Sequence, residues 1–286
     1  MSATSVRPWL LMAPALILLS VLLVIPMLIM VIYTLFLYVD IGVDRAELGL
    51  QNWIAFLTDN YYYYALWKTA RVALITTVVS VVVGFVPAYV IAQANARYRW
   101  LLMLMLLLPF WISFVIRTMS WIHVLGVRGA INSFLLWAGL IGTPFEMLYN
   151  EAAVIIGLTH FILPFTILNI FVAIEASDRN LPAVARTLGA PPFAVFREVT
   201  LPLAMPGVAT GALLAFVLAA GAYVTPIILG GPGDFLFGNL IFSTTMVEIN
   251  WPMGSTLAVA LVMILAALTV LYNRYFGLER LTRGLA

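Results

Sequence analysis

Long apolar runs, separated by short polar segments, fill most of this chain. Six of them reach the length of about 20 apolar residues that a helix needs to cross a bilayer. They cover residues 9–37, 66–92, 100–124, 152–174, 206–229 and 255–276. The pattern predicts an all-α fold, a polytopic transmembrane helical bundle with six spans.

The first run is interpreted as a retained helix. It is longer than the 7–15 apolar residues of a signal peptide, and no small-residue cleavage site follows it. A shorter apolar stretch at residues 129–148 is expected to form a helix at the membrane interface or over the outer mouth.

Composition points to the same class of protein. The chain is 64% hydrophobic and 9% charged, whereas a soluble domain is about 45–50% apolar and about 25% charged. The absence of cysteine and the presence of only two histidines argue against disulfides, thiol chemistry and a Cys/His metal site. We expect no cofactor, no metal and no nucleic-acid partner, with the lipid bilayer as the solvent.

The distribution of basic residues favours cytoplasmic N- and C-termini. With that orientation, nine of the 14 basic residues face the cytoplasm: Arg7, Arg97, Arg99, Arg179, Arg186, Arg197, Arg274, Arg280 and Arg283. Most acidic residues fall on the outer side: Asp40, Asp44, Glu47, Asp59, Glu146, Glu151, Asp234 and Glu248.

Residues 177–205 form a polar interruption between the fourth and fifth runs, on the predicted cytoplasmic side. Asn180 is placed to cap a short helix whose first turn contains Pro182, and Gly189 is placed to end it. Spacings of three and seven residues put three apolar side chains on one face of this helix: Leu181, Val184 and Leu188.

A second short helix is expected after the glycine. Pro191 and Pro192 set a turn and open this helix, which continues through Glu198. Pro202 and Pro206 are then expected to break the chain before the fifth span. Two short helices with exposed apolar residues, outside the lipid, predict a soluble partner with a groove.

The spacing in this segment resembles the cytoplasmic loop of permease subunits of ATP-binding-cassette (ABC) importers with the type I fold. The family pattern is Glu-Ala-Ala, three residues, glycine, nine residues, then Ile-x-Leu-Pro. Gly189 takes the glycine, the final residues are Val-Thr-Leu-Pro, and Ala185 takes the last alanine. Ala183 stands where the family has glutamate and Val184 where it has the first alanine, which puts any ion pair from that glutamate to the ATPase in doubt.

Other stretches resemble the spermidine/putrescine branch of this family, from about Gln51 to Tyr275. They include "LLLPFWISFVIRTMSWIHVLGVRGAINSFLLWAGLIGTP", "YVTPIILGGPGDFLFGNLI" and "NWPMGS". Permeases for opines, amino-acid derivatives, phosphonates and iron share much of this pattern. The resemblance implies a single permease domain over residues 1–286, with a core over about 62–276.

The resemblance also implies the function and the partners. The chain would form a path for a small polar solute, such as a polyamine, an opine or an amino-acid-like molecule, together with a second permease in the bacterial inner membrane. A periplasmic binding protein would deliver the solute, and a separate pair of ATPase subunits would hydrolyse ATP, so the chain itself is not an enzyme. The residues expected to contact the ATPase are Leu181, Val184, Ala185, Leu188, Gly189, Ala190, Pro191, Leu201 and Pro202.

Four residues are candidates for lining the translocation path. Arg117 lies in an apolar run, where charge is costly and often functional, although arginine near an interface often reaches the headgroups instead. Trp111 and Tyr223 could equally pack between helices. Asp234 could attract a cation or the binding protein, or lie solvated in "LGGPGD", which we interpret as a flexible outer loop because it lacks the residues of a phosphate loop.

Two other classes of protein remain as alternatives. A secondary transporter or channel would need a carboxylate at the membrane midplane or an inverted repeat, whereas the acids lie near span ends or in loops and no repeat is visible. An intramembrane enzyme would need acids or a nucleophile beside a base, but His123 and His160 fall in different runs with no acid nearby and are expected to be packed. The pattern favours the importer permease.

Overall fold

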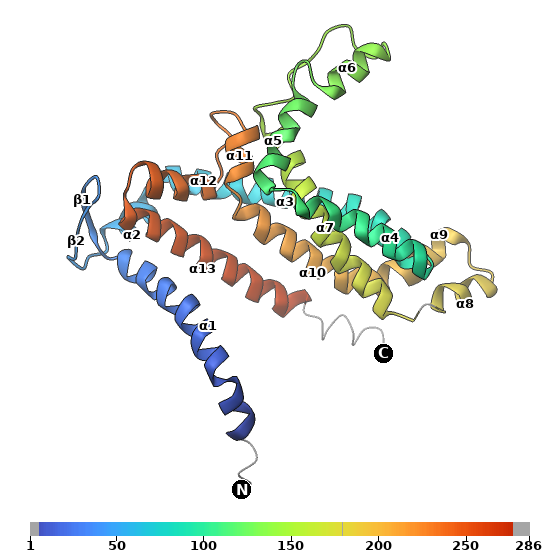
Figure 1. Cartoon of the computed structure of the whole chain (residues 1–286), viewed down its shortest axis with the longest axis horizontal. Coiled ribbons are helices and arrows are strands. Elements are labelled where there is room, and N and C mark those ends of the chain that lie inside the picture. Colours follow the sequence, from blue (N-terminus) through green and yellow to red (C-terminus); the bar gives the residue numbers. More distant parts are fainter. Residues whose placement is uncertain (1–5, 179, 277–286) are drawn as a thin grey trace. The chain divides into compact units, whose positions relative to one another are not determined.

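The computed structural model describes residues 6–178 and 180–276 (Figure 1). Arg179, Arg280 and Arg283, on which part of the predicted orientation rests, lie outside the described residues. The first elements are α1 (Val6–Tyr33), β1 (Leu37–Asp40), β2 (Val43–Arg45), α2 (Gln51–Thr58), α3 (Asn60–Gln93), α4 (Ala96–Leu107), the 3-10 turn η1 (Leu108–Trp111), α5 (Phe114–Leu125) and α6 (Ala130–Trp137). They are followed by α7 (Glu151–Ala176), α8 (Leu181–Thr187), α9 (Pro192–Val195), the π-helix η2 (Phe196–Thr200), α10 (Leu201–Ala220), α11 (Val224–Leu229), α12 (Phe237–Phe242), the π-helix η3 (Ser243–Val247) and α13 (Trp251–Phe276).

The predicted transmembrane bundle is confirmed, with one span bent. Five helical stretches are long and apolar enough to cross a membrane: Met12–Tyr33, Asn60–Gln93, Glu151–Ala176, Pro192–Ala220 and Trp251–Arg274. A sixth results if Ala96–Trp111 and Phe114–Trp137 count as one span, although they meet at 95°. The third span, predicted over residues 100–124, is therefore present only as a bent pair of helices. Pro109 has no N–H to continue the α-helical ladder, and the chain passes through a 3-10 turn to an extended Ile112.

The fifth span also differs from its predicted limits. Pro202 and Pro206 do not break the chain, because helical structure is continuous from Pro192 to Ala220. Pro202 lies in the first turn of α10, where a missing N–H is tolerated. The span ends at Ala220 and not near residue 229, and α11 follows as a separate short helix.

Contacts between residues divide the chain into two compact units, and a single domain over residues 1–286 stays a prediction. Unit 1 comprises residues 1–62 and 240–264, and unit 2 comprises residues 63–239 and 265–286. In unit 1, β1 and β2 form an antiparallel hairpin with Leu37 opposite Arg45. The amide of Asn52 donates to the carbonyl oxygens of Thr34 and Phe36, both at 2.9 Å, which ties α2 to the end of α1.

Unit 2 is built around α3, α7 and α10, with α7 and α10 side by side (Figure 1). One buried cluster joins these helices through Val72, Ala73, Val154, Leu158, Ile162, Ala215 and Ala219. A second joins them through Ala88, Ile91, Ile167, Ile170 and Ala204. Small residues allow the close approach: a Cβ on Gly207 of α10 would lie 2.5 Å from Cβ of Ala173 and 2.9 Å from Cα of Ile170 on α7.

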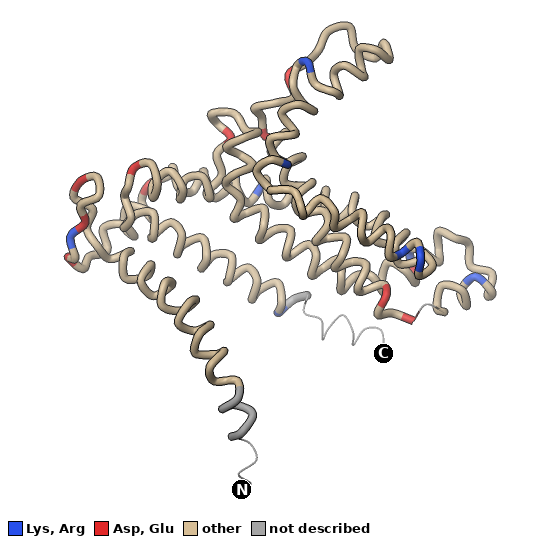
Figure 2. Tube along the Cα trace, viewed as in Figure 1, with Lys and Arg blue, Asp and Glu red and all other residues tan. Residues whose placement is uncertain are grey.

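Most charged residues of unit 2 lie toward the ends of its long helices and in loops, whereas Arg117 lies within the short helix α5 (Figure 2). Three ion pairs hold these ends together: Lys68–Asp234, Arg71–Glu151 and Arg99–Glu175. The guanidinium of Arg99 also donates to the carbonyl oxygens of Ala92 and Ala94, both at 3.0 Å, at the end of α3. Pairing thus neutralises these charges, which lowers the cost of an ionised side chain close to the apolar spans.

Candidate functional site and its relatives

The short helix α8 begins next to Asn180, as predicted, but its capping is different. The side chain of Asn180 makes no capping hydrogen bond. Instead, Oδ1 of Asp178 accepts a hydrogen bond of 2.9 Å from the backbone N–H of Asn180. Asn180 has helical backbone angles (φ −80°, ψ −25°) and not the extended ones that point an N-cap side chain back at the first turn.

Gly189 ends α8 in the predicted way. Its φ is +89°, in the left-handed region that favours glycine. The N–H of Gly189 donates to the carbonyl of Arg186 at 3.0 Å, and the N–H of Ala190 donates to the carbonyl of Ala185 at 3.1 Å. These two bonds form a Schellman motif, so the turn between the two short helices has one defined shape.

The predicted apolar face of α8 is exposed. Leu181, Val184 and Leu188 are all open to solvent, and Leu188 is 83% exposed. Phe193, at the start of α9, extends this exposed apolar surface. We call Leu181, Val184, Leu188 and Phe193 the coupling face.

The remaining predicted coupling residues surround this face. Pro191 is exposed, while Ala185, Ala190, Leu201 and Pro202 are half-buried. Ala185 and Ala190 take part in the Schellman turn through their backbone groups, and Leu201 and Pro202 open α10. The structure therefore brings the whole predicted segment together as α8, a glycine turn and a continuous helix into the membrane span.

Behind the coupling face, η2 connects the short helices to two spans. It contacts α8, α9 and α10, and Thr200 at its end is buried. The ring of Phe196 packs edge-to-face on Phe85 of α3, with centroids 5.5 Å apart and planes at 85°. This contact was not expected from the sequence. No sequence pattern indicates the π-helix before Pro202. None indicates that Phe85 and Phe196, which are far apart in the chain, come into contact.

The four candidate path residues are each held by different neighbours. Trp111 is exposed on η1. Tyr223 offers its carbonyl to the amide of Asn239 at 2.7 Å. Arg117 is buried on α5, donates to the carbonyl of Pro109 at 3.1 Å and lies 5.3 Å from the centroid of the Phe110 ring. A role of these residues in the path stays a prediction.

Asp234, the fourth candidate, belongs to a loop that is held firmly. Its carboxylate pairs with Lys68 at 2.9 Å and accepts the N–H of Gly231 at 3.1 Å. The ammonium of Lys68 also donates to the carbonyl of Gly233, and the N–H of Phe237 donates to Oγ1 of Thr69 at 2.7 Å. The expectation of a flexible outer loop was wrong, because these bonds tie residues 231–237 to α3.

The two histidines differ. Nδ1 of His160 accepts a hydrogen bond of 3.1 Å from the indole of Trp121, and their rings pack 5.5 Å apart, which confirms the packed role. His123 is exposed, so the same expectation was wrong for it. Within residues 6–178 and 180–276, no group of three or more His, Cys, Asp and Glu residues is placed to hold a metal.

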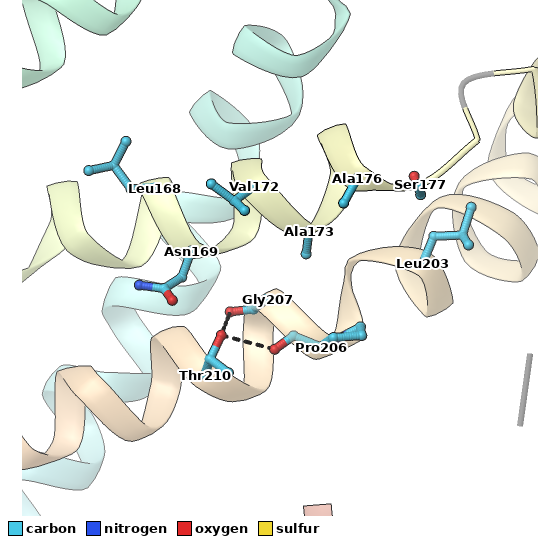
Figure 3. Close-up of a pocket in the computed structure, with 10 residues that line it drawn as sticks. All are labelled: Leu168, Asn169, Val172, Ala173, Ala176, Ser177, Leu203, Pro206, Gly207 and Thr210. Atoms are coloured by element: carbon cyan, nitrogen blue, oxygen red, sulfur yellow. Dashed lines mark hydrogen bonds between the residues drawn. The ribbon is translucent and has the colours of Figure 1, made fainter. Parts of the chain in front are cut away.

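A groove of about 590 Å³ opens between α7 and α10, close to the coupling segment (Figure 3). It was not expected from the sequence. Asn169 and Thr210 supply polar groups. The amide of Asn169 donates to the carbonyl oxygen of Phe165 at 2.9 Å, and the hydroxyl of Thr210 donates to the carbonyl oxygen of Pro206 at 3.0 Å. The rest of the lining is mainly apolar: Leu168, Val172, Ala173, Ala176, Ser177, Leu203, Pro206 and Gly207.

The chain is similar to known proteins in sequence and in fold. No protein-family model matches the chain. The spermidine/putrescine transport system permease protein PotB of Haemophilus influenzae is 37% identical over 218 residues, which are 76% of this chain and 76% of that protein. The PotB protein of Escherichia coli is 34% identical over 218 residues, 76% of this chain and 79% of that protein. The chain belongs to the permease family of ABC importers. It is therefore a membrane-spanning transport subunit and not an enzyme.

Solved structures agree on the fold. A chain of the bacterial alginate ABC transporter, in complex with its alginate-bound periplasmic protein, has a TM-score of 0.73 at 18% identity and 94% coverage of both chains. The MetNI methionine ABC transporter in an inward-facing conformation has a TM-score of 0.57 at 19% identity, covering 75% of this chain and 94% of that one. The type I importer permease fold is confirmed for this permease. The orientation of its termini stays a prediction.

Proposed function

We propose that this permease forms, with a second permease, the inner-membrane path of an ABC importer for a polyamine or a similar small polar solute. A periplasmic binding protein delivers the solute, and a separate ATPase pair docks on the coupling face and drives the change in access. The PotB relatives support the solute class and the importer assembly. The observation that carries the docking proposal is the exposed apolar face of α8, held in one conformation by Gly189.

The physical reason for docking is the cost of leaving this face in water. Burying a leucine or valine side chain contributes about 1.5–3 kcal/mol, and Leu188 has most of its side chain available. A helix laid in a groove is a common mode of recognition. A capped helix also transmits displacement better than an unstructured loop, because its backbone has a single conformation.

The position of the acids restricts what this chain contributes to solute selection. Among the described spans, Glu151 and Glu175 lie at helix ends and pair with Arg71 and Arg99. A polyamine at the midplane would therefore meet hydroxyl, amide and aromatic groups of this chain. Selection for its charge would come from the binding protein and from the second permease.

The test of docking is a charge placed on the coupling face. Leu188→Glu should abolish co-purification of the ATPase from native membranes. The control is Leu48→Glu, at an exposed leucine outside the coupling face, which should leave ATPase recovery unchanged. Equal recovery of the ATPase with both variants would refute docking on α8. Uptake of labelled spermidine by the assembled complex in proteoliposomes should require ATP and binding protein; uptake without ATP would support a secondary transporter or channel.

A further inference from the structure

The edge-to-face contact between Phe85 and Phe196 connects the coupling segment to a span other than its own. We propose that Phe85 is a positioning residue for transport, which carries the displacement of α8 and α9 to α3 through Phe196. The proposal rests on the proposed function, because it assumes that the ATPase moves the coupling segment.

The π-helix η2 lies where Phe196 faces α3. Phe196 opens the five-residue π-helix η2, and the N–H of Leu201 donates to its carbonyl across the widened turn. The extra residue of a π-turn rotates the side chains on one side of it by about 100° relative to those on the other. Such turns are frequent at functional sites. Pro202, which has no N–H, follows directly.

The short helices of the coupling segment pack directly on η2. It contacts α8 and α9 as well as α10, and Val195 just before it is 2% exposed. The Schellman turn at Gly189 holds α8 and α9 in one arrangement. A displacement of the coupling face therefore reaches η2 through packed helices without first being absorbed by a loose loop.

Phe85 contacts the core of unit 2. Phe85 packs against the buried cluster that joins α3, α7 and α10. Its neighbour Gly84 brings α3 close to α7, since a Cβ there would lie 3.3 Å from Cγ1 of Ile167. The ion pair of Arg99 with Glu175, together with its bonds to the end of α3, ties the same helices at their ends. A push at Phe85 moves α3 and α7 as one body.

The coupling segment thus has two routes to the long helices of unit 2. One is covalent, because η2 continues into α10. The other is the ring contact with α3. If only the covalent route operated, α10 would shift against α3 and α7, and the small-residue contacts between α7 and α10 would be disturbed. The ring contact allows the helices to move together.

The experiment measures labelled spermidine transported per ATP hydrolysed by the co-purified complex in proteoliposomes with its binding protein. Phe85→Ala should lower this ratio by about threefold to tenfold, as expected for losing an aromatic pair, with ATP hydrolysis and ATPase recovery unchanged. Phe196→Ala should give the same loss, and the double variant should be no worse than either single variant. Phe85→Tyr, which keeps the ring, should restore the ratio.

Phe171→Ala is the matched control, since Phe171 packs against the same cluster from α7. It should lower thermal stability without changing the transport ratio. If Phe85→Ala does not assemble, Phe196→Leu tests the contact from its more exposed partner. An unchanged ratio in the assembled Phe85 or Phe196 variant, or additive losses in the double variant, would overturn the proposal.

A second readout does not depend on the solute. Because the chain has no cysteine, spin labels on cysteines introduced at the exposed positions Gln93 and Arg197 would be the only ones on this permease. Their separation should be the same in the nucleotide-free and ATP-trapped complex, and should differ between the two states in Phe85→Ala. A separation that stays constant in this variant would overturn the role of Phe85. Failure of Leu188→Glu to release the ATPase would instead count against the proposed docking.

Discussion

The ammonium group of Lys68 on α3 lies 2.9 Å from Oδ1 of Asp234, and the two side chains are only 9% and 19% exposed. The two residues are more than 160 positions apart in the chain. Lys68 also donates a hydrogen bond to the carbonyl oxygen of Gly233. Asp234 was expected to line the translocation path, but here its carboxylate is part of a buried ion pair that connects two segments of the fold. It anchors the N-terminal part of α3 to the segment that precedes α12.

Removing one member of this pair should destabilise the protein. Asp234→Asn leaves the buried ammonium of Lys68 without a counter-charge, and we expect a loss of about 3 kcal/mol in the free energy of unfolding. The exchange of both residues, Lys68→Asp with Asp234→Lys, should recover part of it. Glu47→Gln, in an exposed ion pair with Arg45, should change stability by less than about 1 kcal/mol.

The same variants separate a structural role from a role in the path. Thermal unfolding in detergent measures stability, and ATP-driven uptake in proteoliposomes measures function. If the exchanged pair recovers stability and uptake together, Asp234 acts through its ion pair. Recovery of stability with no uptake would show that a carboxylate is needed at this position by the solute or the binding protein.

Gly189 should tolerate only residues that accept a positive φ. No atom outside its chain neighbours lies within 4 Å of a Cβ built at this position, so the cost of substitution is in the backbone and not in a clash. Gly189→Val should cost about 1–2 kcal/mol locally and reduce ATPase recovery. Gly189→Asn, which enters the left-handed region more readily, should retain most of it. Equal recovery with valine and asparagine would contradict a conformational role for the glycine.

The close approach of α7 and α10 at Gly207 predicts strong sensitivity to size. A Cβ there would collide with the carbonyl oxygen of Asn169 and lie 2.5 Å from Cβ of Ala173. Gly207→Val should therefore lower the free energy of unfolding by about 1–3 kcal/mol through overpacking. Gly142→Val, at a glycine with nothing within 4 Å, should have little effect. Melting curves of the two variants in the same detergent measure the difference.

Stability should depend on pH through Asp44 in the hairpin of unit 1. Burial raises the pKa of the Asp44 carboxyl above its ordinary value of 3.8, and within the described residues its Oδ1 has no hydrogen-bond partner. Because the folded state holds this proton more tightly than the unfolded state, the contribution to stability is full below pH 3.8. It is lost as the pH rises through the folded-state pKa.

The variant Asp44→Asn should remove this component of the pH dependence. The difference in Tm between the variant and the wild type should increase in favour of the variant as the pH rises from 3.5 to neutrality. Asp40→Asn, on the same hairpin, reports the effect of removing one charge alone. A pH-independent difference between wild type and Asp44→Asn would contradict the prediction.

The membrane fold and the coupling helix could be predicted because both are encoded locally. An apolar run of sufficient length has to leave water whatever its neighbours are, so α3, α7 and α13 follow from composition. Gly189 could be predicted as a helix end because the preference for a positive φ belongs to the residue itself. The apolar face of α8 follows from the period of a helix.

The other features of the fold and the site depend on contacts between residues that are far apart in the chain and meet only when it has folded. Nothing local indicates that Lys68 pairs with Asp234 or that Phe196 faces Phe85, and Pro109 permits a bend in the third span without setting its angle of 95°. Proline and glycine each permit several backbone paths, and packing selects one of them. The sequence by itself therefore determined which segments enter the membrane and where α8 ends. Tertiary structure decided which charges are neutralised and which helices move together, because both depend on long-range contacts.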